Sequence, residues 1–161
     1  TDDIPKDILN LAYVEISLGT FPIVVTTPLM VCPFGFNKEN NQLTLQFTNV
    51  KENSEMNSFF RFIQELENKQ MKYLGITEDE SDMYISQIRY DKKGRYDPNL
   101  LTKIPFRNTK YLVDIKNKDS ACSISNIYNF TKVRCDIFID KIWKYNDKYV
   151  CKWKVGKILI H

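Results

Sequence analysis

Short runs of apolar residues recur along the chain, most of them rich in β-branched or aromatic side chains and separated by polar turns. Runs of this kind are typical of β-strands, and many short strands beside a single helix predict an antiparallel barrel or sandwich. Prolines at 22, 28 and 33 place the first strand at a sheet edge or break it in two, because proline cannot donate to the ladder. The predicted strands are residues 24–34, 43–50, 83–90, 110–116, 122–130, 133–145 and 148–160.

One segment, residues 54–70, shows helical periodicity. Its apolar side chains recur on one face, which predicts an amphipathic helix packed against the core. These side chains are Met56, Phe59, Phe60, Phe62, Ile63 and Leu66. Ser54 is the expected N-cap, since a serine oxygen can accept a hydrogen bond from the first helical turn. The acidic stretch that follows, residues 76–82, is predicted to be a mobile linker.

The last two predicted strands are joined by Asn146-Asp147, which suits a two-residue hairpin turn because both residues tolerate positive φ. Residue 145 then faces 148, 143 faces 150 and 141 faces 152. One sheet face carries a cationic and aromatic set: Lys141, Trp143, Tyr145, Lys148, Val150, Lys152 and Lys154. The opposite face is predicted to be core: Phe138, Ile142, Tyr149, Cys151, Trp153 and Val155. Asp140 and Lys144 do not fit that apolar face, and a slip of one residue would exchange the roles of the two tryptophans.

With 161 residues, 43% of them apolar, the chain is long enough for one domain with a hydrophobic core, and residues 1–23 are expected to be an N-terminal extension. No apolar run approaches the roughly 18 to 20 residues of a membrane span, and the acidic N-terminus is unlike a signal peptide. We therefore expect a soluble intracellular protein with reduced, buried thiols. Four cysteines and the sequon Asn129-Phe130-Thr131 leave a secreted, disulfide-bonded β-sandwich as an alternative.

Charge is distributed unevenly along the chain. Residues 1–82 contain 6 Lys and Arg against 13 Asp and Glu, whereas residues 83–161 contain 17 against 7. A net charge of −7 thus precedes a net charge of +10. A basic half is typical of nucleic-acid-binding proteins, whose cations neutralise phosphates. It is also compatible with a protein whose basic half packs against its own acidic half.

The residues needed by most enzyme classes are missing. Five glycines in all provide neither a phosphate-binding loop nor a dinucleotide fingerprint, and the only histidine, His161, is the last residue. Nucleophile pairs that need histidine are therefore absent, and without a Cys-x-x-Cys pair we expect no zinc site. The acidic residues of 78–82 are interpreted as a solvated stretch rather than a divalent-ion site. We expect no enzymatic activity, no metal and no cofactor.

The stretch SQIRYDKKGRYDPNLLTKIPFR, residues 86–107, is interpreted as a strand, a loop over 91–99 and a return to the core over 100–106. Asp97-Pro98 favours extended backbone at the exit of the loop, because the residue before a proline avoids helical geometry. We expect four side chains of this loop to lie beside the lysine and tryptophan face of the last hairpin: Lys92, Lys93, Arg95 and Tyr96.

This stretch, together with VDIK and with VRCDIFIDKIWKYNDKYVCKWKVGKILI, resembles the single-stranded-DNA-binding proteins of nucleocytoplasmic large DNA viruses over roughly residues 24–160. The most specific motifs are Tyr96-Asp97-Pro98 leading to Lys103-Ile104-Pro105, and Ile142-Trp143 with Trp153-Lys154 across the hairpin. That family is similar to phage replication binders built on an OB-fold, a small closed Greek-key barrel with a helix between strands.

The resemblance implies sequence-tolerant binding of single strands in viral genome replication, recombination or repair, in the host cytoplasm or nucleus. Relatives often carry an acidic C-terminal tail that recruits replication proteins as further partners. This chain departs from that pattern, because it ends on an apolar strand, residues 157–161.

The candidate interface combines cations for phosphates with the aromatic residues Tyr96, Trp143 and Tyr145 for stacked bases. Its members are Arg89, Lys92, Lys93, Arg95, Tyr96, Lys103, Arg107, Lys141, Trp143, Tyr145, Lys152 and Lys154. The sequence leaves open whether DNA or RNA is preferred, since the 2′-hydroxyl is read by pocket geometry, and it leaves the oligomeric state open. The alternative is a protein-interaction module for viral assembly or host-factor binding, whose basic face meets an acidic partner.

Overall fold

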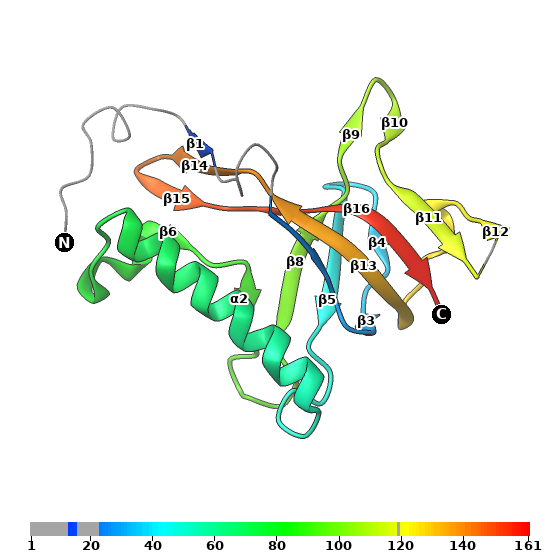
Figure 1. The fold of residues 1–161 in the computed structure, drawn as a ribbon, viewed down its shortest axis with the longest axis horizontal. Helices are drawn as coiled ribbons and strands as arrows, with labels where there is room; N and C mark the ends of the chain where they lie inside the picture. The colour runs from blue at the N-terminus through cyan, green and yellow to red at the C-terminus, as the bar shows by residue number, and fades with distance from the viewer. Residues whose placement is uncertain (1–12, 16–22, 119) are drawn as a thin grey trace.

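Figure 1 shows a computed structural model of the chain, which describes residues 13–15, 23–118 and 120–161. The expected N-terminal extension, residues 1–23, falls almost wholly outside these residues. The strands are β1 (Tyr13–Glu15), β2 (Ile23–Thr26), β3 (Met30–Cys32), β4 (Phe36–Asn37), β5 (Gln42–Gln46), β6 (Tyr84–Ile85), β7 (Ile88–Arg89), β8 (Asn99–Lys103), β9 (Phe106–Arg107), β10 (Lys110–Tyr111), β11 (Asp114–Asn117), β12 (Ser120–Ala121), β13 (Thr131–Ile139), β14 (Lys141–Tyr145), β15 (Lys148–Val150) and β16 (Trp153–Ile160). The described helices are α2 (Ser54–Tyr73) and the 3-10 helices Glu78–Met83 and Ile124–Asn126.

The core of the fold is a closed five-stranded barrel. β3 pairs with β5, β5 with β8, β8 with β16 and β16 with β13, which pairs again with β3 and with β2. Within the barrel, the β8–β16 pairing is parallel and the other pairings are antiparallel. Closure leaves the barrel strands without open edges. The predicted mainly β class, a Greek-key barrel of the OB-fold type with an inserted helix, is confirmed.

Alternation of side chains along the strands forms the barrel core. Along β13, Val133, Cys135, Ile137 and Ile139 are fully buried, while the residues between them are partly exposed. β-Branched side chains fit this role because they pack well on a pleated surface.

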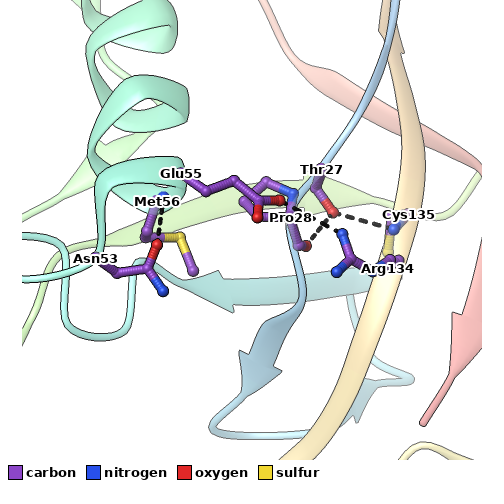
Figure 2. A network of polar contacts seen from close by, with 7 residues as sticks. All are labelled: Thr27, Pro28, Asn53, Glu55, Met56, Arg134 and Cys135. Atoms are coloured by element: carbon purple, nitrogen blue, oxygen red, sulfur yellow. Dashed lines mark hydrogen bonds and ion pairs between the residues drawn. The ribbon is translucent and has the colours of Figure 1, made fainter.

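The first barrel strand is broken, as its prolines predict. β2 and β3 are separated at Thr27 and Pro28, where the Thr27 hydroxyl supplies a hydrogen-bond acceptor to the neighbouring strand β13 (Figure 2). The Thr27 N–H donates to the Cys135 carbonyl at 2.8 Å, and the Cys135 N–H donates to Thr27 Oγ1 at 3.0 Å. Because the hydroxyl replaces a backbone acceptor, β13 runs unbroken past the break.

Helix α2 is inserted between β5 and β8. Its N-cap is Asn53 rather than the predicted Ser54, since Asn53 Oδ1 accepts a hydrogen bond from the Met56 N–H at 3.0 Å (Figure 2). Met56 is buried with Phe59 and Ile63, whereas Phe62 is exposed. The predicted apolar stripe is therefore confirmed but narrower than expected.

Two hydrogen bonds to the buried residue Glu67 connect α2 to the segment that leads into β7. Glu67 accepts a hydrogen bond from the Ser86 hydroxyl at 2.6 Å and another from the Gln87 N–H at 2.8 Å. Burial raises the pKa of the Glu67 carboxyl, while these hydrogen bonds and the charge of Arg89 oppose the shift. At the other end of the helix, Arg134 of β13 lies 3.5 Å from Glu55 (Figure 2).

The predicted terminal hairpin is present as β14 and β15. Trp143 pairs with Val150 and Tyr145 with Lys148, and the turn residues Asn146 and Asp147 have φ values of 49° and 63°. The predicted register of these pairs is therefore confirmed. Most of the predicted core face is buried, namely Ile142, Tyr149, Cys151, Trp153 and Val155.

Phe138 is an exception, because it is only half-buried and its ring lies against Gly156. Alternation does not continue from β13 to β14, since the two strands are separated at Asp140. Asp140, which did not fit an apolar face, occupies this break and lies 3.5 Å from Lys154 Nζ. The structure thus corrects the prediction of one continuous strand over 133–145.

Two further predictions are wrong in their local structure. Residues 122–130 contain the 3-10 helix Ile124–Asn126 rather than a strand, because Ser123 and Asn126 cap each other: the Ser123 N–H donates to Asn126 Oδ1 at 2.9 Å. Such side-chain caps compete with strand ladders. Residues 78–83 likewise form a 3-10 helix, capped by Thr77, in place of a linker.

All four cysteines are free, and Cys32, Cys135 and Cys151 are buried. Burial raises the pKa of the Cys32 and Cys151 thiols to about 12. The closed barrel differs from the β-sandwich of the alternative interpretation. No helix in the described part of the chain has the length and apolar character needed to cross a membrane.

Candidate functional site

An open cleft of about 510 Å³ lies where the terminal hairpin meets the outer surface of the barrel. We call it the main cleft. Residues of β5, β6, β7 and β8 line it together with residues of hairpin β14–β15 and Lys152, which follows the hairpin. The lining residues are Gln42, Ile85, Gln87, Arg89, Leu101, Thr102, Lys103, Trp143, Lys144, Tyr145, Val150 and Lys152.

The bottom of the main cleft follows from strand alternation. Leu100 and Thr102 of β8 point into the core, so Leu101 and Lys103 face outward. Gln42 of β5 is the cross-strand partner of Lys103 and lies on the same outer surface. A basic and amide-bearing strip therefore runs along the barrel surface.

The hairpin contributes two aromatic side chains to the cleft. Trp143 is 39% exposed and Tyr145 is 70% exposed, although both belong to a paired strand. Lys141 Nζ lies 5.6 Å from the centre of the Trp143 ring. The second tryptophan, Trp153, is 2% exposed and belongs to the core. A partly exposed indole with a cation beside it is suited to stacking against a flat, anionic ligand.

The electrostatics of the main cleft are one-sided. Arg89, Lys103, Lys144 and Lys152 all line it, and no Asp or Glu does so among the described residues. Burial is the largest of the effects that lower the pKa of Lys152. The charge of Lys103 and its hydrogen bond to Lys152 lower this pKa further. Two cations held this close repel each other, and a bound anion would relieve the repulsion.

A second cleft of about 280 Å³ continues the groove toward the loop between β3 and β4. It shares Gln42, Arg89 and Leu101 with the main cleft, so the two form one groove across β5 and β8. Its lining residues are Phe34, Gly35, Asn37, Asn40, Gln42, Thr44, Arg89, Asn99 and Leu101.

Phe34 presents an exposed ring at this end of the groove, with 66% of its surface accessible. The next residue, Gly35, has a φ of +62°, and a Cβ there would lie 2.9 Å from the Ile127 carbonyl oxygen. The loop is therefore held against the segment 127–129 with Phe34 directed outward. Sequence reasoning missed Phe34, although an aromatic residue between Pro33 and Gly35 in a predicted strand was a signal of an exposed turn.

The structure brings together five of the predicted interface residues in the main cleft. These five are Arg89, Lys103, Trp143, Tyr145 and Lys152. It adds residues that were not predicted, among them Gln42, Gln87 and Lys144. Lys144, which did not fit the apolar face, has its amino group 5.9 Å from the centre of the buried Tyr149 ring.

The predicted loop residues lie elsewhere. Lys92, Lys93, Arg95 and Tyr96 line neither cleft, because their loop lies at the other end of β8, beside the start of α2 (Figure 1). The loop is held there by the Asn49 N–H, which donates to Asp97 at 3.0 Å, and by the Phe47 N–H, which donates to the Pro98 carbonyl at 2.9 Å. The expected position beside the hairpin is therefore wrong. Ile85 is the last residue of β6 that pairs with β15 of the hairpin, and the loop follows after β7, farther from this pairing.

Three remaining candidates also lie outside the lining of the main cleft. Lys154 pairs with Asp140, and Lys141 lies against Trp143. Arg107 lies on the hairpin of β9 and β10, which follows β8 shortly beyond Lys103.

No protein-family model matches the sequence, and no curated protein matches it. The fold is similar to a solved structure, the C-terminally truncated single-stranded DNA-binding protein from bacteriophage Enc34. The TM-score is 0.56 at 12% sequence identity, over 86% of this chain and 83% of that chain. This likeness supports the barrel fold, while the more specific resemblance to proteins of nucleocytoplasmic large DNA viruses stays a prediction.

Proposed function

We propose that this chain binds single-stranded DNA in the groove formed by the main and second clefts. The observation that carries the proposal is the position of the groove on the barrel. Oligonucleotide-binding barrels of this type use the face of their second and third strands, flanked by the loops after the first and fourth. Here the groove crosses β5 and β8 and is flanked by the Phe34 loop and by hairpin β14–β15.

The chemistry of the groove supports the same ligand. Arg89, Lys103 and Lys152 would neutralise phosphates, and Trp143 and Tyr145 would stack on bases. Stacking accepts every base because each has a π-face, so binding is expected to tolerate sequence. The fold neighbour from bacteriophage Enc34 is itself named as a single-stranded DNA-binding protein.

We further propose that binding protects single strands during viral genome replication, recombination or repair in the host cytoplasm or nucleus. The resemblance of residues 24–160 to proteins of nucleocytoplasmic large DNA viruses supports this role. The groove holds and orients a strand without supplying catalytic groups, and replication proteins would be further partners.

The test is a titration of the protein with a fluorescent oligothymidine at several salt concentrations. The logarithm of the binding constant should fall with the logarithm of salt at a slope of about −0.7 for each phosphate neutralised. A duplex of the same length should bind more weakly, and an RNA oligonucleotide in parallel measures discrimination through the 2′-hydroxyl. Absence of binding at ~50 mM salt would overturn the proposal. Binding of polyglutamate in its place would favour the protein-interaction alternative.

A further inference from the structure

The second cleft contains a polar group that the protein itself leaves unpaired. Asn99 Oδ1 is buried and has no hydrogen-bond partner among the described residues. A buried acceptor without a partner is costly, and native structures pair the great majority of such groups. An unpaired one beside an open cleft is therefore a candidate for contact with a ligand.

We propose that the second cleft binds one nucleobase, stacked on Phe34 and hydrogen-bonded at its edge by the Asn99 amide. The inference rests on the proposed single-strand binding and adds a subsite that recognises a base rather than the backbone.

The other side-chain amides of the second cleft are engaged in the turn before β5. Asn37 Oδ1 accepts from the Glu39 N–H at 2.9 Å, and Asn40 Oδ1 accepts from the Gln42 N–H at 3.0 Å. The Asn40 amide also donates to Gln42 Oε1 at 3.2 Å. Among these lining amides, Asn99 is the one whose Oδ1 is buried without a hydrogen-bond partner, and rotation of the amide group would turn this oxygen toward a base edge in the cleft.

The position of Asn99 suits the edge of a stacked base. It begins β8, on the outer surface that also carries Leu101 and Lys103, and it lies directly across from Arg89 of β7. Arg89 lines both clefts, so its charge lies between the proposed base and the strand in the main cleft. Phe34 supplies the flat partner, held outward because Gly35 fits tightly against the Ile127 carbonyl.

A base differs from a bare backbone in its N–H donors. Thymine has one such donor, N3–H, so methylation at N3 removes the donor and keeps the π-face. If Asn99 accepts this hydrogen bond, the methylated strand should bind the protein more weakly. The effect of one neutral hydrogen bond is about two- to tenfold in affinity.

The experiment compares oligothymidine with oligo-N3-methylthymidine on the full chain and on two variants. Asn99→Leu removes the amide and keeps the size of the side chain. Gln46→Leu is the matched control, because Gln46 is the cross-strand partner of Asn99, lines neither cleft and accepts from the Thr48 hydroxyl at 2.9 Å. The loss on methylation should be about two- to tenfold smaller for Asn99→Leu than for the wild type and for Gln46→Leu.

A third variant tests the stacking partner. Phe34→Ala should weaken binding of oligothymidine by about ten- to a hundredfold and leave binding of an abasic oligonucleotide unchanged. Thermal unfolding of each variant checks the fold, and Asn99→Leu should be no less stable than the wild type because it removes an unpaired buried group.

Each outcome separates the two proposals. Tight binding of oligothymidine with an equal methylation effect in the wild type and in Asn99→Leu would overturn the base subsite and leave single-strand binding in place. No binding of either oligonucleotide by the wild type would overturn the single-strand binding on which the subsite rests.

Discussion

Lys103 and Lys152 face each other in the main cleft, and burial together with the charge of Lys103 lowers the pKa of Lys152. No carboxylate among the described lining residues compensates them. A like-charge pair of this kind destabilises the free protein and is relieved when an anion binds. The pair comes from β8 and from the segment after β15, which are 49 positions apart in the sequence.

Removal of Lys152 should weaken binding without harming the fold. Lys152→Ala should lower the affinity for oligothymidine by about two- to fivefold and reduce the salt slope by about 0.7, the value for one phosphate contact. Lys148→Ala is the matched control, since Lys148 is an exposed lysine of the neighbouring strand β15 and lies outside the lining of the main cleft. Equal losses in the two variants would contradict a specific role for the cleft.

The lowered pKa of Lys152 predicts a pH dependence of binding. The free ammonium loses its proton below the ordinary lysine pKa, and a bound phosphate favours the charged form and raises the pKa again. Affinity should therefore be full at pH values where Lys152 is charged in the free protein, and it should fall as the pH rises through the pKa of Lys152 in the free protein.

Fluorescence titration between about pH 7 and 10 measures this fall. In the variant Lys152→Arg, the part of this fall in affinity that occurs at the lowest pH values should be absent, because a guanidinium keeps its charge throughout this range. An unchanged profile in that variant would show that another group titrates.

Trp143 should act as a stacking platform. Trp143→Ala should weaken binding by about ten- to a hundredfold, because stacking is worth ~1 to 3 kcal/mol per base. In the wild type, DNA should quench the emission of Trp143 and leave that of buried Trp153 unchanged. Trp143→Phe should remove this quenching while the protein stays folded by circular dichroism. Loss of the fold in Trp143→Ala would instead identify Trp143 as a core residue.

The loop after β7 should contribute little to binding of a short strand. Lys92→Ala combined with Lys93→Ala should change the affinity for an oligonucleotide of about 8 nucleotides by less than about twofold, because neither residue lines the groove. Lys103→Ala serves as the comparison inside the cleft. A larger effect of the loop variant would mean that the strand passes over the end of β8 near α2.

Gly35 and Gly94 allow a test of how the Phe34 loop is held. Both have positive φ, at +62° and +66°, but a Cβ at Gly94 would have no heavy atom within 4 Å. Gly35→Ala should cost roughly 2 kcal/mol or more in unfolding free energy, against about 1 kcal/mol for Gly94→Ala. Urea denaturation measures both. Gly35→Ala should also weaken DNA binding, because it displaces Phe34. Normal DNA binding by this variant would show that the Phe34 loop is not part of the site.

Local patterns predicted much of this fold. Alternation identified the inward residues around Trp153, and Asn146-Asp147 predicted the turn and register of the hairpin, because both depend on neighbouring residues. The strand predictions failed at two places where side-chain capping or a break in the strand overrode the alternation of apolar residues. Ser123 and Asn126 cap a 3-10 helix in a segment that reads as a strand, and the break at Asp140 shifts the alternation that placed Phe138 in the core.

The residue pattern was enough to predict a mainly β chain with one amphipathic helix, a basic second half and a terminal hairpin that carries Trp143. Which cations lie beside that tryptophan depends on long-range strand pairing, which no local pattern contains. Closure of the barrel through the parallel pairing of β8 with β16 brings Lys103 to the hairpin. The basic loop of residues 92–96 is held at the other end, because the Phe47 N–H donates to the Pro98 carbonyl and the Asn49 N–H donates to the Asp97 carboxylate. Both places carry cations and aromatic residues, but long-range strand pairing sets the distance between them.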